Sequence, residues 1–281
     1  MEKDIISNIS WYNIDKTEKV NEGATMVKPE PRTYALITGA SSGIGMAIAT
    51  ELAKYGMNLI LVARRHDRLE SLKNSLEVDY PIQVIIKEYD LSQLDNCVRL
   101  HSETTELHPK IVINNAGFGQ IGPFDELPLM KEKEMIDLNI SSVHLLTKLY
   151  VGSMQEGVIM NVASMAGFLP TPLMATYAAS KAFVVNFSRA INYELKKQKR
   201  QVSVLSLCPG PVKTEFGLVA HGRETGRGMN VDRCARIAVR GLMKRKAVII
   251  PGMQMKLVYL LLRLLPMRWV LAMSYRLQKD K

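Results

Sequence analysis

Residues 34–53 read YALITGASSGIGMAIATELA, in which a short apolar run, a glycine-rich turn and an apolar-periodic segment follow one another. This order predicts a buried strand, a tight turn and a helix. Glycines in such a turn let the backbone approach a pyrophosphate closely, and the start of the helix offers free N–H groups and the positive end of its dipole. The turn therefore predicts a dinucleotide site. The residues expected to contact the dinucleotide here are Gly39, Ser41, Ser42, Gly43, Ile44 and Gly45.

The same alternation of apolar runs and helical periods continues to residue 250. Nearly continuous apolar strands separated by helices indicate a parallel sheet that is covered on both faces. The predicted fold class is therefore α/β, a doubly wound, Rossmann-type parallel sheet with helices on both faces. Strands are expected at 34–38, 58–62, 83–88, 111–114, 157–162, 202–207 and 247–250. Helices are expected at 43–55, 67–77, 94–101, 129–152, 175–196 and 231–243.

Two appendages flank this pattern. Residues 1–32 are polar and lack sustained periodicity, which predicts a poorly ordered N-terminal extension before a catalytic domain at 33–252. Residues 253–281 are predicted to form a basic amphipathic helical tail. Two roles for the tail stay open: it docks on the protein's own core or on a second subunit, or it makes a peripheral contact in a membrane interface.

Charge is divided unevenly along the chain, whose net charge is +10. Residues 1–180 carry 16 basic and 22 acidic side chains, whereas residues 181–281 carry 21 basic and 5 acidic ones. This asymmetry favours an anionic partner, namely a phosphate-bearing ligand, an acidic carrier protein, a membrane surface or nucleic acid, and a solvated basic face is the alternative.

Composition also bears on where the protein works. The chain shows no apolar secretory segment and no uninterrupted apolar stretch of about 20 residues, so neither secretion nor a spanning helix is expected. Its three cysteines lie far apart, which argues against a disulfide framework and against a cysteine-bound metal. The expected location is cytoplasmic, with peripheral membrane association as the alternative.

The end of the second expected strand carries the signal for cofactor choice. Arg64 and Arg65 stand where a dinucleotide fold that prefers NAD would place an acidic residue for the ribose 2′-hydroxyl. Two guanidinium groups suit a 2′-phosphate, with which arginine makes charge-assisted hydrogen bonds. NADP(H) is therefore predicted over NAD(H), and the alternative is that both arginines face solvent at a strand end.

A reactive group is expected at the end of the fifth strand and in the helix that follows it. Tyr177 and Lys181 are four residues apart and so share a helix face, where the ammonium group is expected to lower the pKa of the phenol. Tyr177 then becomes a usable general acid or base. Ser164, at the carboxyl end of a strand, is placed to donate a hydrogen bond to a carbonyl oxygen as negative charge develops on it.

Taken in order, these motifs resemble the classical short-chain dehydrogenase/reductase family over residues 33–252. The resemblance adds Asp90, the Asn-Asn-Ala-Gly run at 114–117, Asn139, and the Pro-Gly-Pro-Val-Lys-Thr run at 209–214. It implies that Asn139 anchors a water in a proton relay, that Lys181 also holds the nicotinamide ribose, and that 209–214 lines the nicotinamide site. Cofactor contacts expected beyond the glycine-rich turn are Arg64, Arg65, Asp90, Leu91, Asn115, Ala116, Gly117, Tyr177, Lys181, Pro209, Gly210, Val212 and Thr214.

The resulting prediction is an NADP(H)-dependent oxidoreductase that interconverts a ketone and a secondary alcohol. A fatty-acyl or steroid-like substrate is favoured by the apolar residues of two segments, 165–175 and the loop at 214–230. The loop contains Phe216, Leu218, Val219 and Met229. The resemblance also implies a homo-oligomer, dimeric or tetrameric. Two other functions stay open, a catalytically silent nucleotide-sensing module and a nucleic-acid binder that uses the basic third. No nucleic-acid partner and no metal are expected.

Overall fold

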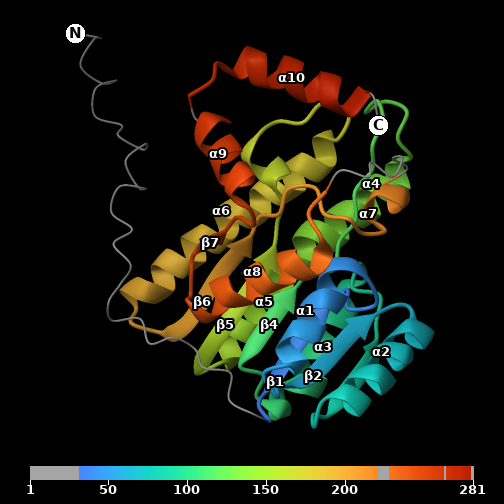
Figure 1. The fold of residues 1–281 in the computed structure, drawn as a ribbon, viewed down its shortest axis with the longest axis vertical. Helices are drawn as coiled ribbons and strands as arrows, with labels where there is room; N and C mark the ends of the chain where they lie inside the picture. Colours follow the sequence, from blue (N-terminus) through green and yellow to red (C-terminus); the bar gives the residue numbers. More distant parts are fainter. Residues whose placement is uncertain (1–31, 221–227, 263, 280–281) are drawn as a thin grey trace.

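The sheet of the computed structural model has seven parallel strands in the order β3-β2-β1-β4-β5-β6-β7 (Figure 1). The structure describes residues 32–220, 228–262 and 264–279, so of the predicted N-terminal extension only Arg32 lies within the described residues. The predicted doubly wound α/β fold is confirmed. The strands are β1 (Tyr34–Thr38), β2 (Asn58–Ala63), β3 (Val84–Glu88), β4 (Ile111–Asn114), β5 (Glu156–Val162), β6 (Gln201–Leu207) and β7 (Val248–Ile249).

Helices cover both faces of the sheet because neighbouring residues of each strand point to opposite sides. In β1, Ala35 and Ile37 belong to one buried cluster and Leu36 to another. The first cluster packs under α1 (Gly43–Ala53), α2 (His66–Asp79) and α8 (Val231–Met243). The second packs under α3 (Leu94–Thr104), α5 (Ser142–Ser153) and α6 (Ala175–Lys197).

The strand order reverses at β1, which pairs with β2 on one side and with β4 on the other. The connections leaving β1 and β4 therefore diverge, and the carboxyl ends of these strands border a crevice. In open α/β sheets ligands bind at such a point. The glycine-rich turn after β1 and the Asn-Asn-Ala-Gly run after β4 both start there.

The helix predicted over 129–152 is divided in the structure. α4 (Leu129–Ile136) and α5 are joined by a single π-helical turn at Asp137–Ser141. Such turns insert one extra residue per turn and occur frequently at functional sites. This one contains Asn139, whose side chain it turns into the protein interior.

The tail is helical and is divided at Pro266. It forms two helices, α9 (Met253–Leu262) and α10 (Met267–Lys279), with Pro266 between them because proline cannot continue the hydrogen bonding of a helix interior. α9 packs through Tyr259 on Phe168, with ring centroids 4.6 Å apart, and Arg189 Nη2 donates to Tyr259 Oη at 3.2 Å. Among the described residues, no helix is long and apolar enough to cross a bilayer.

Candidate active site

The glycine-rich turn approaches the β4 end so closely that its first and last glycines cannot carry a side chain. Gly39 has a φ of 64°, and a Cβ there would lie 2.8 Å from Asn115 Nδ2. A Cβ on Gly45 would lie 2.5 Å from the same atom. Both distances are shorter than real Cβ contacts, so the turn is built for close backbone approach, as a dinucleotide cradle requires.

Side chains at the two strand ends hold this cradle in place. Asn115 Nδ2 donates to the carbonyl oxygens of Thr38 (2.9 Å) and Gly39 (3.2 Å). The hydroxyl of Thr38 accepts hydrogen bonds from the backbone N–H groups of Asn115 (2.9 Å) and Ala116 (3.0 Å). The positioning role of Thr38 was not predicted, although threonine directly before a glycine-rich turn, facing a second strand end, is a usable signal.

The two arginines after β2 face different partners. Arg65 lies over the glycine-rich turn, where its Nη2 donates to Ser41 Oγ (3.1 Å) and Ser42 Oγ (2.8 Å). Its Nη1 pairs with Glu215 at 3.1 Å, and Arg68, not predicted as a site residue, pairs with the same carboxylate at 2.7 Å. Arg65, Arg68 and Glu215 therefore form a group of net charge +1 beside the turn.

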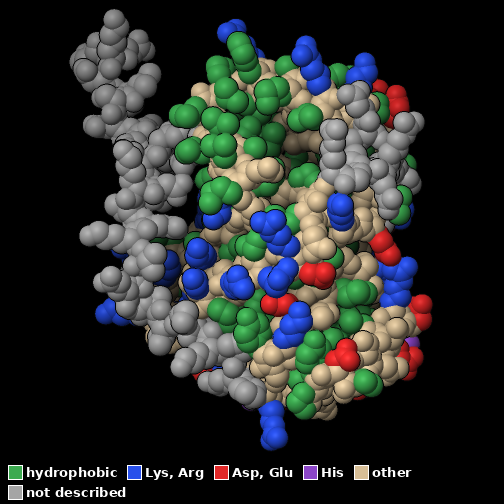
Figure 2. Space-filling model, viewed as in Figure 1, with side chains coloured by type: hydrophobic (Ala, Val, Ile, Leu, Met, Phe, Trp, Pro, Cys, Tyr) green, Lys and Arg blue, Asp and Glu red, His purple; other side chains and the backbone are tan. Residues whose placement is uncertain are grey.

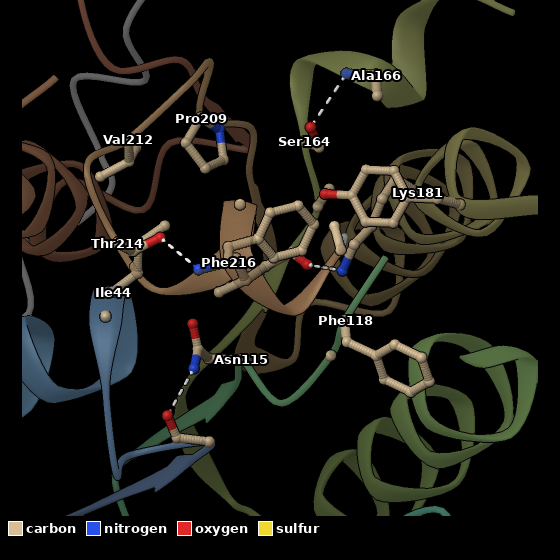
Figure 3. A pocket seen from close by; sticks show the side chains of 18 of the residues that line it. Ile44, Asn115, Phe118, Ser164, Ala166, Lys181, Pro209, Val212, Thr214 and Phe216 are labelled. Atoms are coloured by element: carbon tan, nitrogen blue, oxygen red, sulfur yellow. Dashed lines mark hydrogen bonds between the residues drawn. The ribbon is translucent and has the colours of Figure 1, made fainter. Parts of the chain in front are cut away.

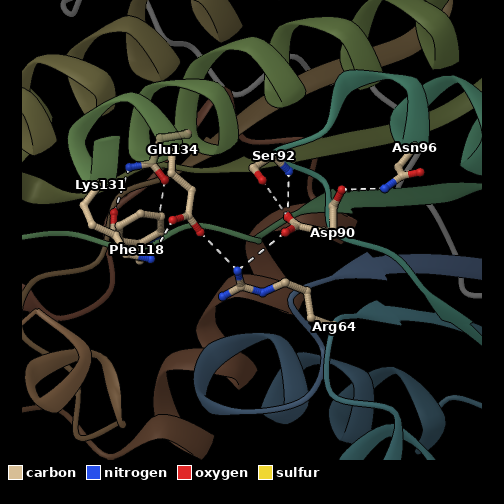
Figure 4. Close-up of polar contacts among 8 residues, drawn as sticks. Arg64, Asp90, Ser92, Asn96, Phe118, Lys131 and Glu134 are labelled. Carbon is tan, nitrogen blue, oxygen red and sulfur yellow. Dashed lines mark hydrogen bonds and ion pairs between the residues drawn. The ribbon is translucent and has the colours of Figure 1, made fainter. Parts of the chain in front are cut away.

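Arg64 points instead toward the end of β3 (Figure 4). Its Nη1 lies 3.1 Å from a Glu134 carboxylate oxygen and 3.7 Å from an Asp90 carboxylate oxygen. Lys131 Nζ pairs with the same Glu134 carboxylate at 2.7 Å, so these four residues have no net charge. Burial alone would raise the pKa of Asp90, but hydrogen bonds from Ser92 and the charge of Arg64 outweigh burial and hold that pKa below its ordinary value.

Tyr177 and Ser164 both line the crevice, and Figure 3 shows the Ser164 side chain with its hydrogen bond to Ala166. The Ser164 hydroxyl lies close enough to the phenol to oppose the effect of burial on the pKa of Tyr177. Ser164 ends the loop after β5 and its Oγ accepts from the N–H of Ala166 at 3.1 Å, which fixes its orientation. The Tyr177 ring is buried against Phe216, with centroids 5.4 Å apart. Two hydroxyl groups therefore converge where a carbonyl oxygen could accept from both.

The expectation that Lys181 lowers the pKa of Tyr177 is wrong for this structure. Lys181 Nζ donates to the carbonyl oxygen of Val162 at 3.0 Å and lies 5.8 Å from the centroid of the phenol ring. Burial dominates both groups: it raises the pKa of Tyr177 to about 12, against the opposing effect of the Ser164 hydroxyl, and lowers the pKa of Lys181 to about 8. Tyr177 is therefore protonated throughout the neutral range and is ready to act as an acid.

Asn139 lies behind the reactive groups and does not reach the crevice. Its Nδ2 donates to the carbonyl oxygen of Phe118 (2.9 Å) and to Ser180 Oγ (3.1 Å), and its Oδ1 accepts from the N–H of Phe118 (3.2 Å). Ser180 Oγ in turn donates to the carbonyl oxygen of Tyr177 at 2.7 Å. The π-helical turn is thereby connected to the helix that carries the reactive tyrosine.

A buried polar network that sequence reasoning missed supports the floor of the site. Asn114 Nδ2 donates to Asn161 Oδ1 (2.8 Å) and Thr147 Oγ1 (3.2 Å), and Asn161 Nδ2 donates to Ser188 Oγ (3.0 Å). These four residues join β4, β5, α5 and α6. Polar residues in strands that are otherwise apolar were the available signal, since buried polar groups need partners.

One cavity of about 650 Å³ collects nearly all of the predicted site residues. The exceptions are Gly45, which packs behind the turn, and Asn139. The predicted residues that line the cavity are Gly39, Ser41, Ser42, Gly43, Ile44, Arg64, Arg65, Asp90, Leu91, Asn115, Ala116, Gly117, Ser164, Tyr177, Lys181, Pro209, Gly210, Val212 and Thr214.

The apolar side of the cavity differs in part from its prediction. Met165, Met174 and Phe216 line it, whereas Leu218 is exposed and Met229 contacts Val212 and Gly252 instead. The Val219 side chain and residues 221–227 lie outside the described part of the chain. The tail supplies a wall that was not predicted, made of Val258, Leu262, Val270, Met273, Ser274, Leu277 and Gln278.

A profile of the family described as short chain dehydrogenase matches residues 33–221, more than half of the chain. The chain belongs to the short-chain dehydrogenase family. The predicted family and its oxidoreductase class are therefore confirmed.

Members of the short-chain dehydrogenase family with related sequences include a mouse protein named very-long-chain 3-oxoacyl-CoA reductase. It is 33% identical over 201 residues, which are 69% of this chain and 64% of the mouse protein. The match thus spans less than two thirds of that relative's length.

Solved members of the family have the same fold. A short-chain dehydrogenase from Sphingobium yanoikuyae, determined in complex with NADPH, is 32% identical with a TM-score of 0.76, covering 83% of this chain and 92% of that one. A bulky-bulky ketone specific alcohol dehydrogenase from Comamonas testosteroni is 28% identical with a TM-score of 0.73, covering 84% and 92%. The NADPH complex supports the predicted NADP(H) cofactor, and neither relative supports a silent sensor or a nucleic-acid binder.

Proposed function

We propose that this short-chain dehydrogenase uses NADPH to reduce a ketone to a secondary alcohol on a long apolar substrate, foremost a 3-oxoacyl thioester. One observation carries the proposal. The hydroxyls of Ser164 and Tyr177 meet in a cavity that has a polar cradle on one side and apolar side chains on the other. A volume of about 650 Å³ lies within the range of ordinary ligand pockets.

The cradle fits NADP(H) in its residue chemistry. Gly39 and Gly45 let the turn pack directly on Asn115 at the β4 end, the Asp90 carboxylate is kept ionised, and the Arg65 group presents a net positive charge beside the turn. Arg65 and Arg68 are the residues proposed to hold the 2′-phosphate, Asp90 and Leu91 the adenine side, and Lys181 the nicotinamide ribose. When bound, NADPH supplies the hydride that adds to the carbonyl carbon.

The chain's own residues supply the proton and stabilise the charge. As the carbonyl oxygen gains negative charge, Ser164 Oγ donates a hydrogen bond to it and Tyr177 Oη transfers its proton to it, which completes the alcohol. Since the pKa of Tyr177 is raised to about 12, its protonated form is available at neutral pH, as proton donation requires. The buried Lys181, whose ammonium donates to the carbonyl oxygen of Val162, is proposed to act on the nicotinamide ribose and not on the phenol.

The apolar wall supports a substrate with a long hydrocarbon part. Met174 packs with Met135 and Tyr177 directly beside the reactive hydroxyl, and α9 and α10 extend the apolar lining outward. The mouse relative is named as a reductase of very-long-chain 3-oxoacyl-CoA, and the Comamonas relative is described as specific for ketones with two bulky sides. The excess of basic residues after position 180 suits the phosphates of coenzyme A or an acidic carrier.

A substrate panel tests this function. The purified full chain would be incubated with NADPH or NADH and with 3-oxoacyl-CoA esters of increasing chain length, oxosteroids and small ketones, while absorbance at the nicotinamide band is followed. We expect kcat/KM to rise with acyl chain length and to be higher with NADPH than with NADH. Turnover confined to small polar ketones, or none with any ketone, would contradict the proposal.

The remaining predictions concern assembly and location. The homo-oligomer, dimeric or tetrameric, and the cytoplasmic location stay predictions, as does the division of the chain into an extension, a catalytic domain and a tail.

A further inference from the structure

The outward side of α9 is an apolar surface exposed to solvent. Every residue of α9 is at least partly exposed, and the side chains of Met253 and Leu264 have exposed fractions of 78% and 75%. We call the outward residues the α9 stripe. It consists of Met253, Leu257, Leu260, Leu261 and Leu264. Contiguous apolar surface of this kind marks an interaction site, since soluble monomers rarely leave it uncovered.

Met253, Leu257, Leu260 and Leu261 are spaced at i, i+4, i+7 and i+8, which places them on one side of α9, and Leu264 follows in the turn after this helix. The other side of α9 is already packed: Met255 reaches Gly210, Tyr259 lies on Phe168, and Leu262 lines the cavity. The protein's own core therefore covers the inner side of α9 and leaves the α9 stripe without a partner among the described residues.

Basic side chains border the α9 stripe. Figure 2 shows the hydrophobic side chains gathered over α9 and Lys and Arg side chains gathered over α8, on the same face of the molecule. Residues 253–279 contain no acidic residue. The exposed basic residues here are Arg233, Arg236, Arg240, Lys244 and Lys246 in and after α8, Lys256 in α9, and Arg268, Arg276 and Lys279 in α10.

We propose that the α9 stripe and its basic border dock on the surface of an anionic lipid bilayer. An apolar stripe with cationic flanks matches the acyl boundary and the phosphate layer of such a surface. Trp269 and Tyr275 are exposed by 58% and 44%, and aromatic rings of this kind favour the headgroup depth. Docking rather than spanning is required, because no described helix can cross a bilayer.

A second copy of the chain is the less favourable occupant. A symmetric contact through the same surface would bring two sets of basic residues together, with Asp232 as the one acidic residue of α8, α9 and α10 to pair them. An anionic bilayer removes that repulsion. Because the inner side of the same two helices lines the cavity, docking would bring the apolar cavity wall next to the lipid phase.

Vesicle co-sedimentation of the full chain tests the proposal. The probes are vesicles of phosphatidylcholine alone and of phosphatidylcholine with phosphatidylglycerol, at low and high salt. The variant Leu257→Gln/Leu260→Gln/Leu264→Gln removes three stripe residues that are all exposed. A matched control, Val78→Gln/Phe124→Gln/Leu129→Gln, removes three apolar residues of comparable exposure elsewhere. Thermal melts of all three proteins report folding.

We expect binding to the anionic vesicles that salt weakens, little binding to neutral ones, at least a tenfold loss in the stripe variant and none in the control. Wild-type protein that ignores anionic vesicles, or equal binding by the two triple variants, would overturn the proposal. A third result would also overturn it: the stripe variant binds vesicles as the wild type does, but sediments as a monomer where the wild type sediments as an oligomer. That result would assign the surface to a second copy of the chain. If the stripe variant fails to fold, the dependence of wild-type vesicle binding on lipid charge and on salt still tests the proposal.

Discussion

The two halves of the cavity are constructed differently. The cofactor half consists of backbone and short polar side chains from the ends of β1, β2 and β4, fixed by hydrogen bonds such as those of Thr38 and Asn115. The substrate half consists of apolar side chains from segments far apart in the sequence, including Met174, Phe216 and Met273. These apolar side chains lack directed hydrogen bonds, so their positions depend on packing.

This difference predicts how each half responds to substitution. A half that depends on directed hydrogen bonds and single charges loses much when one polar atom is removed. A half that depends on apolar area loses in proportion to the area removed. The reactive tyrosine belongs to both, since its ring packs on Phe216 and its hydroxyl meets Ser164.

The largest effect is expected from Tyr177→Phe, which keeps the ring and removes the acid. General acid catalysis contributes about 10²- to 10⁴-fold, so kcat should fall by that factor while NADPH binding changes little. Tyr150→Phe is the matched control: Tyr150 is equally buried, its pKa is also raised to about 12, and its hydroxyl contacts Thr104 at 2.7 Å, outside the cavity. Steady-state kinetics and nucleotide fluorescence titration measure both, and high activity in Tyr177→Phe would refute the assigned acid.

The sequence predicts the cofactor half well and the substrate half poorly for a physical reason. The glycines, Arg65, Asp90 and Tyr177 act close to a strand end or helix start, where local patterns fix the backbone, and all of these except Gly45 line the cavity. Met273 and Leu277 become part of the wall only because Pro266 turns α10 back over the site, a tertiary event with no local signal. The π-helical turn at Asn139 and the charge partners of Arg64 were missed for the same reason.

The next effect separates the two arginines of the cofactor half. Arg65→Ala should weaken NADPH about ten- to a hundredfold and NADH much less, since one charge-assisted bond is worth ~1.5–3 kcal/mol. Arg64→Ala should have a smaller effect on this preference, because two carboxylates already offset the Arg64 charge. The dissociation constants of NADPH and NADH, measured for both variants, test this difference. An equal loss of NADPH affinity in the two variants would mean that Arg64 also contacts the 2′-phosphate.

A third effect is a pH dependence of stability in the cofactor half. Burial lowers the pKa of Lys181 to about 8 from an ordinary 10.5, so the folded protein releases this proton at a lower pH than the unfolded chain does. Stability should therefore rise with pH between about 8 and 10.5, by at most about 1.4 kcal/mol per pH unit.

Lys181→Met provides the reference for that measurement, because it lacks the titrating group while other residues titrate alike. Urea unfolding of both proteins, without nucleotide and in steps of pH from below 8 upward, should give a stability difference that changes in favour of the wild type as pH rises. Parallel curves would show that Lys181 is not desolvated as the structure indicates.

The smallest effect belongs to the substrate half and tests whether α10 is part of it. Leu277→Ala removes apolar surface from the cavity wall, but Leu277 is 66% exposed, so the loss is about that of one buried methylene, about 0.8 kcal/mol, and kcat/KM for a long-chain 3-oxoacyl-CoA should fall only several-fold. The KM for NADPH should not change, because Leu277 lies in the wall supplied by the tail. Leu271→Ala is the matched control, being on the same helix but absent from the cavity lining.

Short-chain substrates should be unaffected by either variant, since they do not reach the tail. A loss that is independent of chain length would mean that Leu277 stabilises the fold around the reactive groups instead of contacting the substrate, and a loss in NADPH binding would remove the distinction between the two halves.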